Sequence, residues 1–281
     1  MKTLKTLYKG TLLSAYVVLK NNILSQKNTR VPEPDEVMED LDGVQEYLHA
    51  MDSDYSGVYN LILSKLTSIL PLEGKALDLG CGPAILTTKL AKAFPKIEWL
   101  GVDASDAMLA LAEKRVYERD IANVHFKKLD YRALDSLDEK FDFICISLML
   151  HHVRAEADAV ELINLSVRRL KPGGALLIFD FVRPRTDKIA LQITDIYTRP
   201  LGEIVYQDSL ASLRAAFSFE EVERILERSN FENYEHARDI LNVYQFVCTK
   251  APRRRRFLPQ AKKPLEWAAY YWHKFLFLGR M

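Results

Sequence analysis

The sequence predicts an α/β fold with a mostly parallel sheet, an antiparallel last strand, a helical N-terminal cap and a basic-aromatic C-terminal tail. Three patterns lead to this prediction. Helical periodicity dominates residues 1–70, apolar runs alternate with amphipathic segments over residues 71–250, and basic and aromatic residues crowd residues 251–281. Such alternation is typical of parallel strands joined by right-handed crossover helices, which cover both faces of the sheet.

The alternating region predicts specific elements in chain order. Apolar runs predict strands at residues 75–79, 97–102, 124–128, 141–147 and 175–181. Helical spacing predicts helices at residues 86–94, 105–118, 155–170 and 219–229. Residues 183–217 have no clear period, so we expect an insertion over the mouth of the sheet. The stretch 234–239 is ambiguous, and residues 243–249 predict the last strand.

The N-terminal region predicts helices at residues 3–24, 36–50 and 53–70, with a break at Pro32 and Pro34. Lysines followed by an apolar stretch also allow a secretory signal at the extreme N-terminus. A small-residue cleavage site is lacking there, which favours a mature amphipathic helix. No apolar run reaches the length of about 18 residues that a membrane-spanning helix needs.

The composition is that of a globular protein. The 281 residues are 48% hydrophobic and 27% charged, with a formal net charge of +1. Cys81, Cys145 and Cys248 lie far apart without a CxxC pair, which argues against a disulfide framework or a zinc site and fits a reducing compartment. We therefore expect a cytoplasmic protein without a bound metal.

A glycine turn follows the first predicted strand. The strand at 75–79 leads into Gly80-Cys-Gly-Pro-Ala84 and then directly into a helix. Gly80 and Gly82 allow a tight turn and a close approach to a ligand, while the helix start offers free N–H groups. A plain structural turn remains the alternative, since one such motif is weak evidence.

A carboxylate follows the second predicted strand. Asp103 ends the run Leu100-Gly-Val-Asp103, at the sheet edge that also carries the glycine turn. A carboxylate in this position can accept hydrogen bonds from both ribose hydroxyls. The alternative is that Asp103 caps the helix that begins near Ser105. The pairing with the glycine turn favours ribose binding.

The motifs together resemble the class I S-adenosylmethionine-dependent methyltransferases, which have a Rossmann-like fold. The resemblance covers about residues 70–249. Residues 77–84, LDLGCGPA, match the family's first motif, and Asp130 stands where the family has an acidic residue near the adenine amine. Residues 141–152 are similar to the fourth motif, and Lys171-Pro-Gly-Gly174 to the fifth.

The resemblance implies S-adenosylmethionine as cofactor. The residues that it implies for cofactor binding are Asp78, Gly80, Cys81, Gly82, Asp103, Ala104, Asp130, Tyr131 and Ser147. Ala84 departs from the usual third glycine, but a small residue there still permits close packing. No GKS or GKT follows the turn, which argues against a nucleoside triphosphate. A dinucleotide dehydrogenase would share the glycine turn, but not the fourth and fifth motifs.

Two histidines follow the fourth predicted strand, at the edge where open α/β sheets bind ligands. In similar carbon-methylating domains a histidine at the position of His151 acts as a base, and imidazole suits that role near neutral pH. We expect His151 to be the catalytic base, with His152 as the second candidate. The alternative is that these side chains satisfy loop carbonyls or line the pocket passively.

Four further residues are candidates for binding the substrate. Tyr55 and Tyr59 precede the first motif, and related enzymes place a tyrosine from an N-terminal helix over the cofactor; plain helix packing is the alternative. Arg183 and Arg185 follow the fifth strand and could hold an anionic acceptor, although solvated surface arginines are common.

The tail combines Arg253 to Arg256 with a segment from Trp267 to Leu278 that is apolar almost all round. Such a helix requires burial against the protein's own N-terminal helices, a second subunit in a homodimer, or an anionic membrane surface. The rest of the chain is acidic on balance, which argues against nucleic acid as a partner.

These patterns leave three functions open. The first is a methyltransferase that acts on a small molecule, hydrophobic or lipid-like, as methyl acceptor. The second is a non-catalytic scaffold that keeps the cofactor fold and acts through its tail. The third is a non-methylating S-adenosylmethionine enzyme similar to the carboxy-S-adenosylmethionine synthases.

Overall fold

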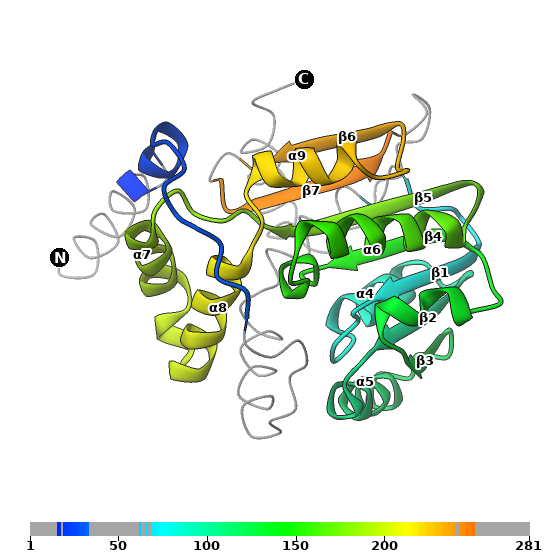
Figure 1. The fold of residues 1–281 in the computed structure, drawn as a ribbon. Coiled ribbons are helices and arrows are strands. Elements are labelled where there is room, and N and C mark those ends of the chain that lie inside the picture. The colour runs from blue at the N-terminus through cyan, green and yellow to red at the C-terminus, as the bar shows by residue number, and fades with distance from the viewer. Residues whose placement is uncertain are drawn as a thin grey trace, which may run out of the picture.

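The computed structural model describes residues 16, 17, 19–33, 62, 66, 69–239 and 242–250. Seven strands form one sheet in the order β3-β2-β1-β4-β5-β7-β6 (Figure 1). The strands are β1 (Gly74–Leu79), β2 (Ile97–Asp103), β3 (Val124–Lys128), β4 (Phe141–Ser147), β5 (Leu170–Phe181), β6 (Tyr234–Arg238) and β7 (Tyr244–Thr249).

The sheet is parallel from β3 to β5 and antiparallel at its other edge. β1 lies between β2 and β4 and pairs with both in parallel. β7 runs antiparallel to β5, and β6 antiparallel to β7. The predicted α/β fold with an antiparallel last strand is therefore confirmed. The ambiguous stretch at residues 234–239 forms β6. β5 begins earlier than predicted, at Leu170, and its register against β4 shifts between Phe141 and Phe143.

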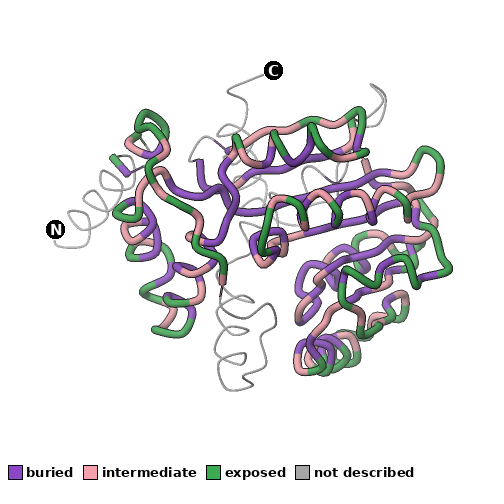
Figure 2. The backbone as a smooth tube through the Cα atoms, viewed as in Figure 1, coloured by how far each residue is buried: buried purple, intermediate pink, exposed green. Residues whose placement is uncertain are grey.

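Helices cover both faces of the sheet. On one face α6 (Glu156–Arg169) and α9 (Phe219–Glu227) bury apolar side chains against β1, β4 and β5. On the other face α4 (Ile85–Ala93) packs with Trp99 and Phe143, and α5 (Asp106–Glu118) lies beside it. Figure 2 shows buried residues along the central strands and exposed residues on the outer sides of α6 and α9.

The sequence predicted an insertion at residues 183–217 but did not identify the helices in it. These residues contain α7 (Asp187–Tyr197), the short 3-10 helix η3 (Arg199–Leu201) and α8 (Glu203–Ala215). Ile189 and Ile193 form a buried stripe on α7, but polar residues such as Thr194 are buried beside them, which obscures the helical pattern. α8 packs against the loop after β4, at the carboxyl end of the sheet.

A segment from the N-terminal region crosses the same end of the molecule. Residues 19–33, here called the strap, are helical over 19–23 and extended afterwards (Figure 1). The Lys27 and Asn28 amides donate to the carbonyl of Arg185 at 2.9 and 3.2 Å, and the Val31 amide donates to the carbonyl of Arg214 at 3.1 Å. These bonds fix the strap on the segment after β5 and on α8. Within the described residues, every helix is too short or too polar to traverse a bilayer.

The strap, β5 and α9 meet at one buried arginine. Arg183 is 3% exposed, and its guanidinium forms two hydrogen bonds of 2.7 and 2.6 Å to the Glu221 carboxylate. It also donates to the carbonyls of Asn28 and Ala216, at 3.1 and 3.0 Å. A buried, bidentate pair of this kind is costly to break from one side, because the remaining charge is left without a partner.

Replacement of Arg183 by methionine should therefore reduce the free energy of unfolding by about 3 kcal/mol, measured by urea denaturation. The matched control is Asp195→Ala, which removes an exposed partner of Arg199 and should cost less than about 1 kcal/mol. Equal losses in the two variants would contradict the structural role of the Arg183 pair.

Candidate active site

A cavity opens at the carboxyl ends of the parallel strands, where open α/β sheets bind ligands. The glycine turn after β1 and Asp103 at the end of β2 form one part of its wall. The loop after β4 and α8 form the opposite part, with the apolar side chains of Leu148, Met149, Val153 and Phe181 nearby. The fold therefore brings residues from six separate segments to one site.

The glycine turn has a backbone that only glycine adopts easily. Gly80 has φ +72°, and a Cβ there would lie 2.4 Å from Met149 Cγ. Gly82 has φ +50°, but a Cβ there would meet no atom within 4 Å, so the turn faces open space. The amides of Gly80 and Cys81 donate to the Val102 carbonyl at 2.9 and 3.0 Å, which ties the turn to β2.

Ala84 occupies the place of the third glycine and caps α4. Its φ of 56° lies in the left-handed region, and it is fully buried. This conformation costs a residue with a Cβ about 1–2 kcal/mol, which explains why glycine would suit the position. The small methyl group nevertheless leaves the first turn of α4 close to the cavity.

Asp103 holds the glycine turn and the start of α5 together. Its Oδ2 accepts a hydrogen bond of 2.8 Å from the Gly82 amide, and its Oδ1 accepts one of 2.9 Å from the Ser105 amide. The Ser105 hydroxyl, and not Asp103, caps α5 by accepting from the Met108 amide. Each carboxylate oxygen keeps a further lone pair, and Asp103 lines the cavity. A ribose diol fits this arrangement.

Asp78 lies beneath the glycine turn and is buried. Burial raises its pKa to about 6; the Thr87 hydroxyl opposes this rise by donating a hydrogen bond to Oδ2, and the Asp103 charge adds to it. Burial also raises the pKa of the Cys81 thiol well above its usual value. Cys81 is therefore a small packing residue in the turn and not a nucleophile.

The other residues expected to bind the cofactor also line the cavity. They are Ala104, Asp130, Tyr131 and Ser147. Asp130 caps the 3-10 helix η1 (Tyr131–Ser136) by accepting from the Arg132 amide at 2.8 Å, and it pairs with the Arg132 guanidinium at 3.0 Å. The structure thus brings all nine predicted cofactor residues together around one cavity.

His151 forms a buried pair with Asp180. It belongs to the 3-10 helix η2 (Leu150–His152), and Asp180 lies near the end of β5. His151 Nδ1 lies 2.7 Å from Asp180 Oδ1, and the His151 amide donates to Asp180 Oδ2 at 3.0 Å. Burial lowers the pKa of His151, but the Asp180 carboxylate, with Glu33 and Asp208, outweighs that effect and raises it above its ordinary value.

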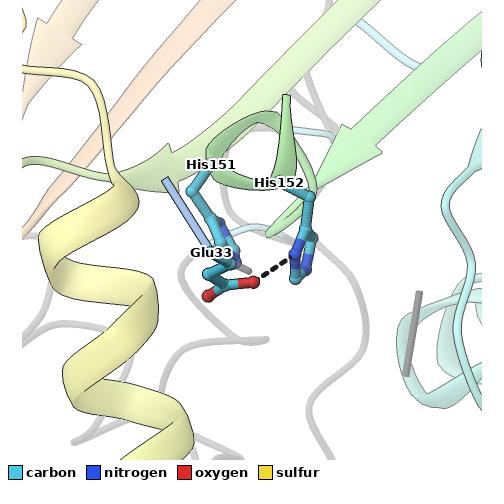
Figure 3. A group of neighbouring side chains, drawn as sticks. All are labelled: Glu33, His151 and His152. Atoms are coloured by element: carbon cyan, nitrogen blue, oxygen red, sulfur yellow. Dashed lines mark ion pairs between the residues drawn. The ribbon is translucent and has the colours of Figure 1, made fainter. Parts of the chain in front are cut away.

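His152 pairs with Glu33, which the strap carries to the site. Glu33 Oε2 lies 2.6 Å from His152 Nδ1 (Figure 3). Ser212 donates a hydrogen bond of 2.9 Å to Glu33 Oε1. The rings of His151 and His152 lie 4.2 Å apart between centroids. Burial opposes ionisation of Glu33, but His152, His151 and Ser212 outweigh it and lower the pKa of Glu33 below its usual value.

Glu33, His151 and His152 each offer a ligand atom within 4.8 Å of the others, a set that could hold a metal ion. Two histidines and one carboxylate resemble the ligands of open zinc sites. Two ligands of a tetrahedral zinc lie about 3.3 Å apart, however. The contact of 2.6 Å between Glu33 and His152 is closer than that, so these two side chains are arranged as a direct pair.

Arg183 and Arg185 do not reach the cavity. The Arg183 guanidinium is bound to Glu221, and Arg185 pairs with Glu220 at 3.1 Å and lies 3.4 Å from Gln26. Neither arginine lines the cavity, so we correct the expected acceptor role to a structural one. Tyr55, Tyr59 and the tail of residues 251–281 lie outside the described residues.

Three acidic residues at the site were not identified from the sequence. Asp180 could have been suspected, because it is a lone acid within an apolar strand and a buried carboxylate requires a partner. Glu33 and Asp208 belong to no motif and reach the site only through tertiary packing of the strap and α8. No local signal in the sequence marks them.

Comparison with known proteins identifies the central part of the chain. A family model described as a methyltransferase domain matches residues 76–174. A ubiquinone/menaquinone biosynthesis C-methyltransferase UbiE from Ectopseudomonas mendocina is 31% identical over 151 residues, which are 52% of this chain and 57% of that protein. The UbiE protein of Vibrio vulnificus is 29% identical over 171 residues, 57% of this chain and 64% of that protein. The chain thus spans less than two thirds of these relatives.

The fold is also similar to that of solved methyltransferases. The plantazolicin methyltransferase BpumL, in complex with SAH, matches with a TM-score of 0.58 and 16% identity over 87% of this chain and 98% of that one. This likeness concerns the fold alone. Residues 76–174 therefore match a methyltransferase domain, and the chain is similar in sequence to S-adenosylmethionine-dependent C-methyltransferases over about half of its length.

Proposed function

We propose that this chain transfers a methyl group from S-adenosylmethionine to a small hydrophobic acceptor, and that the acceptor atom is a carbon of a quinol-like ring. One observation carries the proposal. The cavity joins the glycine turn and Asp103 at one part of its wall to His151, which is paired with the buried Asp180, at another. A ligand site and a proton-accepting group are therefore within one enclosure.

The residues around the first two strands fit the cofactor. Asp103 has free lone pairs for two ribose hydroxyls, and the open space above Gly82 suits the amino-acid part. Asp130 and Tyr131 line the cavity where the resemblance expects the adenine. When bound, S-adenosylmethionine supplies a methyl group on a positively charged sulfur. The protein has to align the acceptor, exclude water and accept a proton.

His151 is suited to accept that proton. Asp180 holds Nδ1, which fixes the Nδ1-protonated tautomer and leaves the Nε2 lone pair available. The imidazolium that forms is stabilised by the same carboxylate. Transfer of a hydroxyl proton from a quinol to Nε2 of His151 would leave a phenolate. Its negative charge would raise the electron density on the ring carbon that is methylated. This supports catalysis over the scaffold alternative.

The choice of acceptor rests on the relatives and on the cavity wall. The UbiE proteins are named as C-methyltransferases of ubiquinone and menaquinone biosynthesis. Leu148, Met149, Val153 and Phe181 give the cavity apolar walls that suit an aromatic ring. Attachment of the tail to an anionic membrane or a second subunit stays a prediction, as does a cytoplasmic location.

Replacement of Asp103 by alanine should weaken binding of S-adenosylhomocysteine at least about tenfold, because hydrogen bonds to a charged group contribute about 1.5–3 kcal/mol. Isothermal titration calorimetry measures this loss. Asp106→Ala is the control, since its carboxylate pairs with Lys128 on the surface. Asp103 also supports the glycine turn, so Asp103→Asn and a thermal melt should accompany it. Unchanged affinity in both Asp103 variants would contradict the ribose role.

His151→Gln and Asp180→Asn should each lower kcat at least about 100-fold, as expected for loss of an oriented base. In the unchanged protein the rate should rise with pH as His151 loses its proton, above the ordinary pKa near 6.5. Loss of the Asp180 charge lowers that pKa, so the rise should shift to lower pH in Asp180→Asn.

The groups that face His151 are Asp180, Glu33, Asp208 and His152. His125 on β3 is exposed and serves as the control position. A His151→Gln enzyme with undiminished kcat, or an unshifted profile in Asp180→Asn, would show that another group takes the proton.

The acceptor class can be tested with methyl-labelled S-adenosylmethionine, the purified chain, and separate lipid and aqueous fractions of a cell extract. Label should appear in the lipid fraction, on a carbon that resists acid and base hydrolysis. Label confined to protein, nucleic acid or a hydrolysable ester would contradict the proposal.

A further inference from the structure

Beyond the histidines, one carboxylate that lines the cavity and one that pairs with His152 come from segments outside the matched methyltransferase domain. Glu33 belongs to the strap and Asp208 to α8, whereas the family model covers residues 76–174. Both lie beside the catalytic histidine pair and not beside the cofactor residues. These additions to the domain are where this chain can define its own acceptor.

The strap is fixed so that Glu33 stays in place. The Arg30 guanidinium donates to the carbonyls of His151, Val153 and Arg154, which ties the strap to the histidine loop. It also lies 3.9 Å above the ring of Phe217. Glu33 lies three residues after Arg30 in the strap. The contacts of Arg30 therefore help to hold Glu33 near His152, in addition to the pair between Glu33 and His152 itself.

Asp208 differs from the other carboxylates of the cluster. Asp180 is paired with His151, and Glu33 with His152 and Ser212. Asp208 lines the cavity but has no hydrogen-bond or ion-pair partner among the described residues. Burial, with the nearby Glu33 charge, raises its pKa to about 6. Asp208 is half-buried, and a ligand in the cavity that donates a hydrogen bond would give its carboxylate a partner.

The charges restrict the ligand that can meet Asp208. Two imidazoles face three carboxylates, so the cluster repels an acceptor with a carboxylate or phosphate at this point. The cavity wall combines Ser209 and Ser212 with the apolar side chains of Leu148, Met149, Val153 and Phe181, so a strongly hydrated ammonium group would lose part of its hydration there. A neutral hydroxyl on an apolar body satisfies the carboxylate without bringing another charge into the cavity.

We infer that Asp208 marks the acceptor-binding end of the cavity, where a hydroxyl group of the acceptor donates a hydrogen bond to its carboxylate. Glu33 is a positioning residue, which holds His152 and keeps a second negative charge beside Asp208. This inference rests on the proposed function, because it assumes that the acceptor enters beside His151. It adds the residue that recognises the hydroxyl group of that acceptor, Asp208.

The test compares three probes that share one apolar tail: 4-hexylphenol, its methyl ether 4-hexylanisole, and 4-hexylbenzylamine. Binding to the full chain loaded with S-adenosylhomocysteine is measured by calorimetry at pH 7.5. The phenol should bind about tenfold more tightly than the ether, as expected for a hydrogen bond to a charged group. Asp208→Asn should remove most of this preference and leave binding of the ether unchanged.

Glu33→Gln should weaken binding of the phenol less than Asp208→Asn does. Asp195→Asn, an exposed acid on α7, is the control and should behave like the unchanged protein. Equal binding of phenol and ether, tighter binding of the amine, or an unaffected preference in Asp208→Asn would overturn the inference.

A metal-based site is a separate outcome of the same experiment. The protein is dialysed against EDTA, and zinc is then added back with its content measured by mass spectrometry. Phenol binding should be the same with and without zinc. One bound zinc per chain, lost in Glu33→Gln and required for phenol binding, would overturn the inference in favour of a metal site.

Failure of the proposed function would give a different pattern. In that case S-adenosylhomocysteine would not bind to the unchanged protein, or no labelled methyl group would be transferred from S-adenosylmethionine. If S-adenosylhomocysteine binds and the methyl group is transferred, but the phenol and the ether bind equally, only the role of Asp208 is wrong.

Discussion

The parallel pairing of β1 with both β2 and β4 is the constraint on which the site depends. Because the strand order reverses at β1, the connections that leave β1 and β4 diverge and leave a crevice beyond their carboxyl ends. The glycine turn and Asp103 lie on one side of this crevice, and the His151 loop lies on the other. A cofactor and an acceptor can therefore meet there without any large change in the sheet.

The sheet alone does not complete the acceptor end. α8 lines that end of the cavity, and the strap is bound to α8 and to the histidine loop. Arg183 holds the strap through Asn28 and α9 through Glu221, so one buried ion pair links the acceptor end to the sheet. The stability of this pair and the shape of the acceptor site are thus coupled, although Arg183 itself does not line the cavity.

The sequence was informative where a local pattern reflects a local requirement. Apolar runs identified the strands. The glycine turn and Asp103 identified one part of the cavity wall, because a turn with positive φ favours glycine and a carboxylate at a strand end stands out in the sequence. Residues 183–217 were not recognised as helical, since buried polar residues such as Thr194 obscure the period. Asp208 and Glu33 could not be identified, because their role arises only when distant segments pack together.

The cluster at the acceptor end suggests why its carboxylates come from separate elements. Asp180 on β5 is rigidly placed and orients His151 through two hydrogen bonds. Glu33 comes from the strap, far from His152 in the sequence, and pairs with His152. Each histidine thus has its own carboxylate, which leaves Asp208 as the acid without a protein partner among the described residues. Two satisfied pairs stabilise the cluster, and the third carboxylate remains available to the acceptor. A cavity with every acid paired would be more stable, but it would have no group left to recognise a hydroxyl.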